Sequence, residues 1–504
     1  MSQHEQTVSI IGSGLGGLVC GAILAMHGYR VSIYEKNKQI GGCLQTFSRD
    51  KAILDSGVHY IGGLEPGQSL YEVFRYLGIA AHLKLLKMDA DGFDVINFAG
   101  EDKEYKLAQG YDNFIAQLLK DFPEEEVALH AYCDKLKEIC SKFPLYNLRM
   151  GNYTEKESVL SISVAGFLQS ITTNERLQQV LAGNNLLYAG KAEKTPLYVH
   201  ALVTNSYIES TYKCVDGGSQ IGKLLHGVIK AHGGVIHRNA PVVAIVGEGD
   251  RIDHLRLENG SIIKSDHFIS NVHPAQTLQM TESNLLRNAY KTRISTLENT
   301  PGAFIINVTL KPGVFPYLNY NYYAHATGNA WAGVNYTPEN WPLTWAMFVA
   351  ASKHAMPYAD NLTLMSYMHV DEVEAWKDTF NTTSHESGRS AEYQAFKEEK
   401  AKQLLAKVYG RFPQLEDAIL HYYVATPLTY RDYIGTADGG MYGVEKDFND
   451  TLKTFISART KLANLYLTGQ NLNLHGIMGV TMSAVMTCGE IIGLESLLEA
   501  ITQH

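Results

Sequence analysis

The sequence is poor in cysteine, and the few cysteines that it has are scattered. Its 504 residues include six cysteines, with no CxxC pair and no cysteine and histidine spacing typical of a zinc site. We therefore expect neither a disulfide framework nor a metal site. Free cysteines are typical of a reducing compartment, so we expect a cytoplasmic protein.

The sequence also lacks a block of basic residues and an uninterrupted apolar stretch. Lysine and arginine number 43 and aspartate and glutamate 52, for a net charge of −9, which excludes the basic surface that a nucleic-acid partner requires. Residues 8–26 are mostly apolar, but they contain five glycines and follow Glu5 rather than a basic region. We interpret them as a buried strand, turn and helix, not as a membrane span.

The periodicity of apolar residues divides the chain into blocks. Residues 7–65 read as strand, helix and strand, 66–205 are mostly helical, 217–275 mix helix and strand, and strands dominate from 300 to 440. The predicted helices include 111–119, 125–143, 159–170, 220–231, 391–409 and 480–498. The predicted strands include 8–11, 30–34, 235–245, 252–257, 268–271, 304–310, 345–350, 362–369 and 465–468. Glu258-Asn259-Gly260 is the turn of a predicted hairpin.

A glycine-rich turn follows the first predicted strand and opens the first predicted helix. Its GxGxxG pattern consists of Gly12, Ser13, Gly14, Leu15, Gly16 and Gly17. Such glycines allow a tight turn, a close approach of backbone to a pyrophosphate, and close packing of helix on sheet. Glu35 ends the second strand, where a carboxylate can accept hydrogen bonds from ribose hydroxyls. The pattern predicts a dinucleotide site, for NAD or for FAD.

A second glycine-rich stretch is similar to a P-loop but lacks one essential residue. Residues 217–223 fit GxxxxGK, but the next residue is Leu224, so the hydroxyl that would hold magnesium is missing. We interpret this stretch as the opening of a helix.

Further segments resemble one family of flavoproteins. Gly41-Gly42 with Thr46, and residues 55–63 with Val58, His59 and Tyr60, are similar to segments of the amine oxidase-like flavoprotein superfamily. So is Val242, in a strand expected to pack at the adenine end. That family usually has a basic residue after the glycine pair, and here Cys43 stands there.

The C-terminal segment resembles the same family most specifically. A strand ending in Thr468-Gly469-Gln470 is followed by a glycine-spaced loop and a helix, which we expect to begin with Gly479 and Val480. Together with residues 426–433 and 439–443, it most resembles the phytoene desaturase, carotenoid isomerase and retinol saturase branch. Since two such turns hold one FAD in that family, the two ends of the chain are expected to meet.

The resemblance implies an α/β fold: a Rossmann-type FAD-binding domain of the glutathione-reductase kind with an inserted mixed α+β substrate domain. We expect residues 1–65, 206–275 and 455–504 in the FAD-binding domain and 66–205 and 276–454 in the substrate-binding domain. The residues expected to contact FAD are Gly12, Ser13, Gly14, Leu15, Gly16, Gly17, Glu35, Lys36, Gly41, Gly42, Thr46, Val58, His59, Tyr60, Val242, Gly469, Gln470, Met478, Gly479 and Val480.

The resemblance further implies an FAD-dependent oxidoreductase that acts on carbon–carbon double bonds of a polyene or isoprenoid lipid. Saturation, desaturation and cis/trans isomerisation all fit. The loop around His475 favours saturation or isomerisation, because it most resembles that branch. His475 and His59 are candidate catalytic residues; His59 has a ring-packing role as its alternative. NAD(P)H is a candidate electron donor.

The substrate is inferred from composition as well as from resemblance. Eight aromatic residues crowd residues 317–345, and they suit the wall of a pocket for an extended apolar ligand, although such a stretch is also typical of plain core. They are Tyr317, Tyr320, Tyr322, Tyr323, Trp331, Tyr336, Trp341 and Trp345. An apolar substrate and the lack of a span predict peripheral contact with membranes. The alternatives are a flavin amine oxidase and a lipid-binding escort protein that has lost catalysis.

Overall fold

Strands from both ends and the middle of the chain form a parallel five-stranded sheet. The computed structural model describes residues 6–353, 356–383, 385–386 and 388–503. The strand order is β10-β2-β1-β14-β23, and every pair is parallel. The strands are β1 (Thr7–Ile11), β2 (Arg30–Tyr34), β10 (Val235–His237), β14 (His267–Ser270) and β23 (Leu465–Leu467). The sheet therefore joins the two ends of the chain, as expected.

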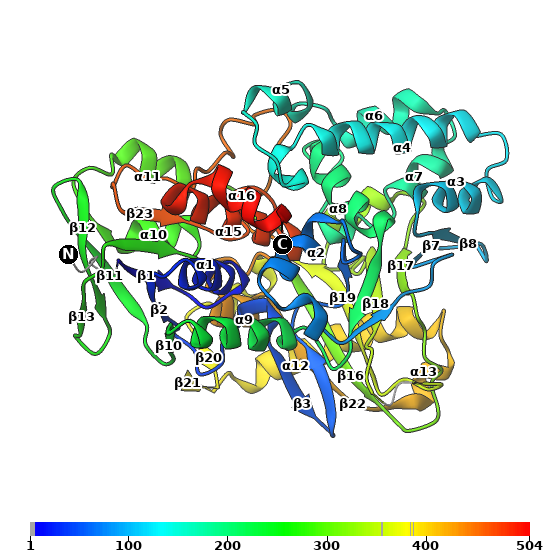
Figure 1. Ribbon diagram of the computed structural model, residues 1–504. Coiled ribbons are helices and arrows are strands. Elements are labelled where there is room, and N and C mark those ends of the chain that lie inside the picture. The colour runs from blue at the N-terminus through cyan, green and yellow to red at the C-terminus, as the bar shows by residue number, and fades with distance from the viewer. Residues whose placement is uncertain (1–5, 354–355, 384, 387, 504) are drawn as a thin grey trace.

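Both faces of this sheet are covered, which explains the continuous apolar runs in its strands. On one face lies α1 (Leu15–Met26), between α9 (Ser219–Ala231) and α15 (Gly476–Ile492) (Figure 1). On the other face, Ile11 and Phe268 pack against Ile245 and Leu255 of a second sheet. The result is a layered α/β unit with the ends of its parallel strands left open.

The second sheet has the order β13-β12-β11-β15, with β11 (Val242–Glu248), β12 (Arg251–Leu257), β13 (Ile262–Ile263) and β15 (Thr281–Glu282). The hairpin at Gly260 is confirmed, since β12 and β13 are antiparallel. The prediction of a single strand over residues 235–245 is wrong. It is divided between β10 and β11, which belong to different sheets, because Asn239 has a positive φ and Pro241 has no amide hydrogen to continue a ladder.

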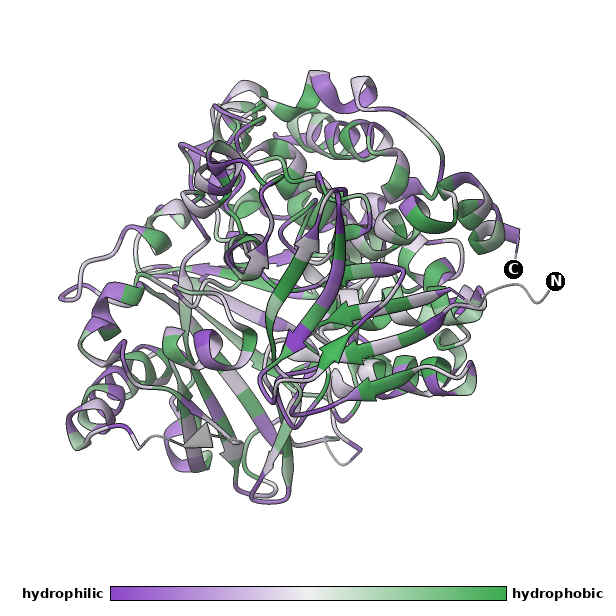
Figure 2. Ribbon diagram, turned by 90° about the vertical axis from the view of Figure 1, so that its left-hand side faces the viewer, coloured by the Kyte–Doolittle hydropathy of each residue, from purple (hydrophilic) through white to green (hydrophobic). Residues whose placement is uncertain are grey.

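A seven-stranded sheet brings together two distant parts of the chain. Its order is β22-β16-β19-β18-β17-β7-β8, with only the β7 and β17 pair parallel. The strands are β7 (Asp94–Phe98), β8 (Glu104–Leu107), β16 (Gly302–Leu310), β17 (Asn321–His325), β18 (Thr344–Val349), β19 (Asn361–Met368) and β22 (Ile419–Ala425). Hydrophobic residues dominate the strands, whereas the peripheral helices alternate between hydrophobic and hydrophilic residues (Figure 2). The division of the chain into two domains stays an interpretation.

Helices α3 (Tyr111–Leu119), α4 (Glu126–Ser141) and α12 (Ala391–Tyr409) lie where the sequence predicts them. The predicted helix 159–170 is instead two helices, α5 (Thr154–Leu160) and α6 (Val164–Ile171), because Ser163 is extended and caps α6 by accepting a hydrogen bond from the Gly166 amide.

The predicted helix 480–498 differs at both ends. Helix α15 already begins at Gly476, and Gly493, at φ +90°, separates it from α16 (Leu494–Gln503). No helix in the described ranges is long and apolar enough to cross a membrane.

Candidate functional site

A cavity of about 400 Å³, here called the main cavity, lies at the carboxyl ends of the parallel strands. Gly12 follows β1, Glu35 follows β2, Asn271 follows β14 and Gly469 follows β23, and all four line it. This edge of an open parallel sheet is where ligands bind in doubly wound folds. The site therefore depends on strands from both ends of the chain.

The Gly-rich turn requires glycine for steric reasons. Gly12 has φ +89°, and a Cβ on Gly17 would lie 2.1 Å from the carbonyl oxygen of Gly12. Cβ atoms on Gly14 and Gly16 would lie 2.8 and 2.6 Å from the Asn271 side chain. Helix α1 begins at Leu15 without a side-chain cap, so its first amides are free to bind an anion at the wall of the main cavity.

Glu35 is held in place by the same turn. One carboxylate oxygen accepts hydrogen bonds from the Ser13 amide (2.9 Å) and hydroxyl (2.6 Å), and the other accepts from the Asn37 amide (2.8 Å). A carboxylate has about four acceptor sites, so the second oxygen keeps capacity for a ligand hydroxyl. The side chain lines the main cavity and is 6% exposed.

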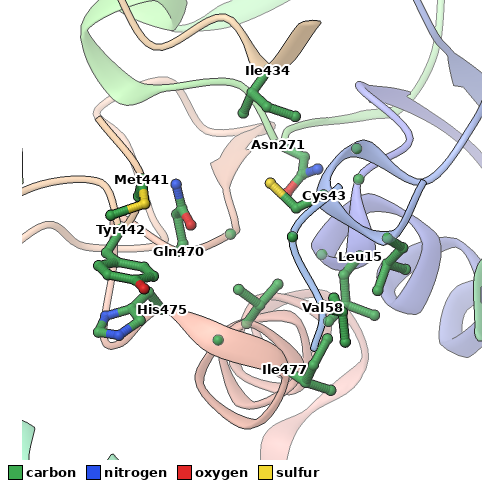
Figure 3. A pocket seen from close by; sticks show the side chains of 18 of the residues that line it. Leu15, Cys43, Val58, Asn271, Ile434, Met441, Tyr442, Gln470, His475 and Ile477 are labelled. Atoms are coloured by element: carbon green, nitrogen blue, oxygen red, sulfur yellow. The ribbon is translucent and has the colours of Figure 1, made fainter. Parts of the chain in front are cut away.

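The Gly41-Gly42 loop crosses directly over the Gly-rich turn. Gly42 has φ +56°, and its Cβ would lie 3.2 Å from the Cα of Gly14. Cys43 points into the main cavity beside Asn271 (Figure 3), and burial raises the pKa of its thiol to about 11. The thiol is therefore protonated, and no positive charge stands at this position.

The C-terminal turn forms the opposite wall. Gly469 has φ +101°, and the Gln470 side chain points into the main cavity (Figure 3). Because α15 begins at Gly476, its first turn lines the main cavity through Gly476, Ile477 and Met478. The expected start at Gly479 is wrong. Gly479 instead faces its own loop, where a Cβ would lie 2.4 Å from the Leu474 carbonyl oxygen.

Most residues of the predicted site meet in the main cavity. Those that line it are Gly12, Gly14, Leu15, Gly16, Glu35, Lys36, Gly41, Gly42, Val58, His59, Tyr60, Val242, Gly469, Gln470, His475, Met478 and Val480. Ser13, Gly17, Thr46 and Gly479 lie behind the wall. Ser13 holds Glu35, and the Thr46 hydroxyl donates a hydrogen bond to Ser219, at the start of α9.

The two candidate histidines are both neutral at neutral pH. Burial, together with the positive charge of Lys213, lowers the pKa of His59 to about 4. The His59 ring stacks on Phe348 at 4.4 Å, and it has no hydrogen-bond partner in the described part of the protein. It therefore stays open to a ligand in the main cavity.

His475 is engaged on both sides. Its Nε2–H donates a hydrogen bond to the Leu187 carbonyl (2.9 Å), and its ring packs against Tyr442 at 4.4 Å. Burial lowers its pKa to about 4. The bond to Leu187 assigns the proton to Nε2, so His475 has no proton to donate from Nδ1.

The family follows from a match to almost the whole chain. Residues 15–492 match the model of the flavin-containing amine oxidoreductases. The chain belongs to this family. It is thus an FAD-dependent oxidoreductase.

Several curated relatives of this flavoprotein are similar over most of its length. It is 26% identical to the human (Homo sapiens) all-trans-retinol 13,14-reductase over 540 residues, covering 96% of this chain and 85% of the relative. An "inactive all-trans-retinol 13,14-reductase" of Danio rerio is 24% identical, covering 94% and 83%. A 4,4'-diapophytoene desaturase of Methylomonas sp is also 24% identical but covers 55% of each chain.

Solved structures share the fold of this flavoprotein. Putrescine oxidase superposes with a TM-score of 0.63 at 14% identity, covering 99% of both chains. An oxidoreductase from Methanosarcina mazei gives 0.62 at 16% identity, covering 95% of this chain and 98% of the other. The expected fold class, a Rossmann-type FAD-binding fold with a substrate domain, is confirmed.

The main cavity of the flavoprotein fits FAD. The glycine turns remove Cβ atoms where backbone must approach a ligand, the first amides of α1 are free to bind phosphate, and Glu35 keeps an acceptor for a ribose hydroxyl. Bound FAD supplies the two-electron redox chemistry, and the chain contributes binding, orientation and electrostatics. The contact of each residue with FAD stays a prediction.

Tyr60 connects the main cavity of the flavoprotein to a buried polar cluster. Its hydroxyl donates to Asp94 (3.1 Å) and lies 2.6 Å from the hydroxyl of Tyr323. Asn321 and Asn184 also donate to Asp94, whose pKa burial nevertheless raises to about 7. The hydroxyl of Tyr60 is therefore engaged by the sheet.

The aromatic stretch does not line the site of the flavoprotein. The eight aromatic residues between 317 and 345 are predicted to form a pocket wall, but none of them lines the main cavity. Tyr322, Tyr323, Trp341 and Trp345 belong to the core. The aromatic and apolar side chains that do line it include Tyr207, Phe348 and Met365. Their positions on separate elements leave no local pattern in the sequence.

Sequence reasoning also missed Asn271, against which the glycines of the first turn pack. Its position at the end of a predicted parallel strand is a signal that could have identified it.

Proposed function

We propose that this flavoprotein acts on carbon–carbon double bonds of an apolar polyene or isoprenoid, with saturation of one double bond as the leading reaction. The observation that carries the proposal is the distribution of charge around the main cavity. Glu35 and Lys36, both at the end of β2, are the charged side chains among its described lining residues apart from histidine. The remaining wall combines apolar and aromatic side chains with uncharged polar ones such as Asn271 and Gln470, and it suits an uncharged ligand. The relatives named for retinol reduction and diapophytoene desaturation support this class of substrate.

A balanced saturation needs two electrons and two protons for each double bond. The reduced cofactor supplies the electrons and one hydrogen, and the second proton has to come from the solvent or the protein. His59 is the candidate that supports this role, because its ring is open to the main cavity. Since its pKa is about 4, His59 would pass on a proton rather than store one.

The reaction is tested by mass analysis. The reduced protein is incubated without oxygen with a panel of polyenes that includes all-trans-retinol. A gain of two hydrogens supports saturation, an altered retention at constant mass supports isomerisation, and a loss of two hydrogens with the oxidised protein supports desaturation. Unchanged polyenes in every arm would contradict the proposal. NAD(P)H, as the candidate electron donor, is tested by its ability to bleach the flavin absorbance.

The amine oxidase alternative is less well supported. A protonated amine favours a carboxylate partner, and Glu35, the carboxylate among the described lining residues, already accepts hydrogen bonds from Ser13 and Asn37. Cys488 is buried between α1 and α15 and does not line the main cavity, so it is not a link to flavin. The non-catalytic escort is excluded if the purified protein shows flavin absorbance that dithionite bleaches and polyene restores.

Peripheral membrane binding is part of the proposal. Four exposed apolar side chains, here called the apolar rim, support it: Met150 (48% exposed), Tyr153 (38%), Leu452 (70%) and Phe455 (42%). The rings of Tyr153 and Phe455 are in contact at 6.1 Å, which joins the two chain segments into one patch.

We expect the double variant Leu452→Ser, Phe455→Ser to co-sediment less with liposomes than the wild-type protein. The matched control is Val127→Ser on α4, which is 83% exposed outside the rim and should leave binding unchanged. Equal binding by all three proteins would argue against the rim as the membrane contact.

A further inference from the structure

A second cavity, of about 360 Å³, lies beside the main cavity. Its walls come from the 3₁₀ helix η3 (Pro144–Asn147), from α5, from residues 451–458 and from α15. In Figure 1 the orange segment that contains 451–458 runs next to α5 and above α15. The elements that form this cavity are thus distant in sequence and adjacent in space.

The two cavities share a wall. Leu202, Leu474 and Met478 line both of them. Leu202 belongs to α8 (Leu197–Glu209), Leu474 precedes α15, and Met478 lies in its first turn. A ligand in the main cavity is therefore separated from the second cavity only by apolar side chains.

The interior of the second cavity is apolar and adaptable. Met478, Met482 and Met486 line it at intervals of four residues, which places them on one face of α15. Methionine is unbranched and fits irregular apolar ligands. Such a face can move aside for a hydrocarbon chain without a change in the backbone.

Three of the four charged side chains that line the second cavity have partners within the protein. Lys446 donates hydrogen bonds to three backbone carbonyls, of Thr454, Asn471 and Leu472. Arg149 pairs with Glu155, and Glu490 pairs with Arg459. The fourth, Lys156, makes no ion pair among the described residues and lies at the mouth of the cavity, so the charge available to a ligand is at the entrance and not in the interior.

The second cavity reaches the surface at the apolar rim. Tyr153 and Phe455 line it and are also partly exposed. The Lys156 ammonium lies 5.2 Å from the centre of the Tyr153 ring and 5.9 Å from that of Phe455. A cation between two rings attracts both, so Lys156 holds α5 against residues 451–458 at the mouth.

We propose that the second cavity binds the distal hydrocarbon part of an elongated apolar ligand whose reacting double bond lies in the main cavity, with Met478 between the two. This inference rests on the proposed function, because it assumes a polyene or isoprenoid in the main cavity. It adds that the protein discriminates between ligands by their length. A short ligand contacts only the main cavity, whereas a long ligand also contacts the walls of the second cavity.

The test uses two probes that share an allylic alcohol end with a methyl-branched double bond and differ in chain length, all-trans-retinol and the shorter isoprenoid alcohol geraniol. Met482→Trp fills the second cavity from α15, and Leu160→Trp fills it from α5. Val127→Trp introduces the same side chain at a site that is 83% exposed on α4, outside both cavities, and is the matched control. Binding to the FAD-loaded proteins is followed by the perturbation of flavin absorbance, and flavin content and melting temperature verify that each variant is folded.

Met482→Trp and Leu160→Trp should both bind retinol about tenfold more weakly or worse, because each buried CH₂ group that is expelled removes favourable transfer energy. Binding of geraniol by the two variants, and binding of both probes by Val127→Trp, should stay within about twofold of wild type. Retinol binding that survives in both of these folded cavity variants, or a loss that is equal for the two probes, overturns the inference. A wild-type protein that binds neither probe contradicts the proposed function instead.

Discussion

Gly17 illustrates how little space the Gly-rich turn leaves for any side chain. A Cβ at this position would lie 2.1 Å from the Gly12 carbonyl oxygen, so Gly17→Ala has to push the turn away from α1. We expect the variant to lose FAD and to be destabilised by about 1–3 kcal/mol, the usual cost of overpacking. The flavin-to-protein absorbance ratio and urea unfolding measure the two effects.

Gly227→Ala is the matched control for Gly17→Ala. Gly227 lies within α9, and a Cβ there would meet nothing within 4 Å. The control should keep its FAD and gain about 0.5–1 kcal/mol, because alanine favours the helix. Full FAD content in Gly17→Ala would show that the turn can relax.

The charge of Glu35 gives a second prediction at this scale. Glu35→Gln keeps the shape of the side chain but removes the carboxylate that receives the Ser13 and Asn37 amides. We expect FAD to be retained about 10- to 150-fold more weakly, since a charge-assisted hydrogen bond contributes about 1.5–3 kcal/mol. Flavin fluorescence released on dilution measures it. Exposed Glu248 is the control site, and unchanged retention in Glu35→Gln would refute the ribose role.

Among the elements, α15 contributes a positive electrostatic potential to the main cavity. Its N-terminus carries the equivalent of about half a positive charge, and Ile477 of its first turn points into the cavity (Figure 3). Reduction adds negative charge to a bound flavin, so Ile477→Glu should lower the reduction potential. A repulsion of about 1.4 kcal/mol corresponds to about 30 mV for two electrons.

Spectroelectrochemistry measures this potential, with Ile477→Gln as the uncharged control of similar size. A potential that is the same in the two variants would place the flavin away from this helix end. A carboxylate at Gly479 tests nothing comparable, because that position faces the Leu474 carbonyl inside the loop.

For the molecule as a whole, burial keeps several histidines neutral. It lowers the pKa of His59, His325 and His475 to about 4 and that of His200 to about 3. In the unfolded chain these groups take up protons below pH 6.5. Each therefore contributes stability that is present above pH 6.5 and is lost as pH falls towards 4.

His325 allows this effect to be isolated, because it lies in β17 away from the main cavity and donates to the Gly183 carbonyl. The stability difference between wild type and His325→Gln should shrink by about 1.4 kcal/mol per pH unit between pH 6.5 and 4. Urea unfolding at several pH values measures it. Leu364→Ala, at a buried site without a titratable group, should show a constant difference. If the stability difference between wild type and His325→Gln is also constant, the imidazole of His325 takes up its proton at the same pH in the native and the unfolded state.

Local rules explain which parts of this fold were predictable. The turn at Gly12, the carboxylate at Glu35 and the hairpin at Gly260 follow from backbone sterics and short spacings. The start of α15 at Gly476 does not, because the Gly-spaced loop continues into the first helical turn. The split at Pro241 and the aromatic core around Tyr323 depend on which sheet each strand joins, a long-range choice that periodicity does not contain.

The distance in sequence between the two walls of the main cavity has a consequence for biosynthesis. Gly12 emerges from the ribosome more than four hundred residues before the wall that faces it, from Gly469 to Val480. At about 5–20 residues per second, the nascent chain waits roughly 20–90 s between the two. During that interval the flank of α1 that α15 will cover is exposed, and β14, once it is made, has an unpaired edge until β23 follows. The complete cofactor site therefore forms only after Val480 has been made, and these two surfaces favour aggregation of the nascent chain until then.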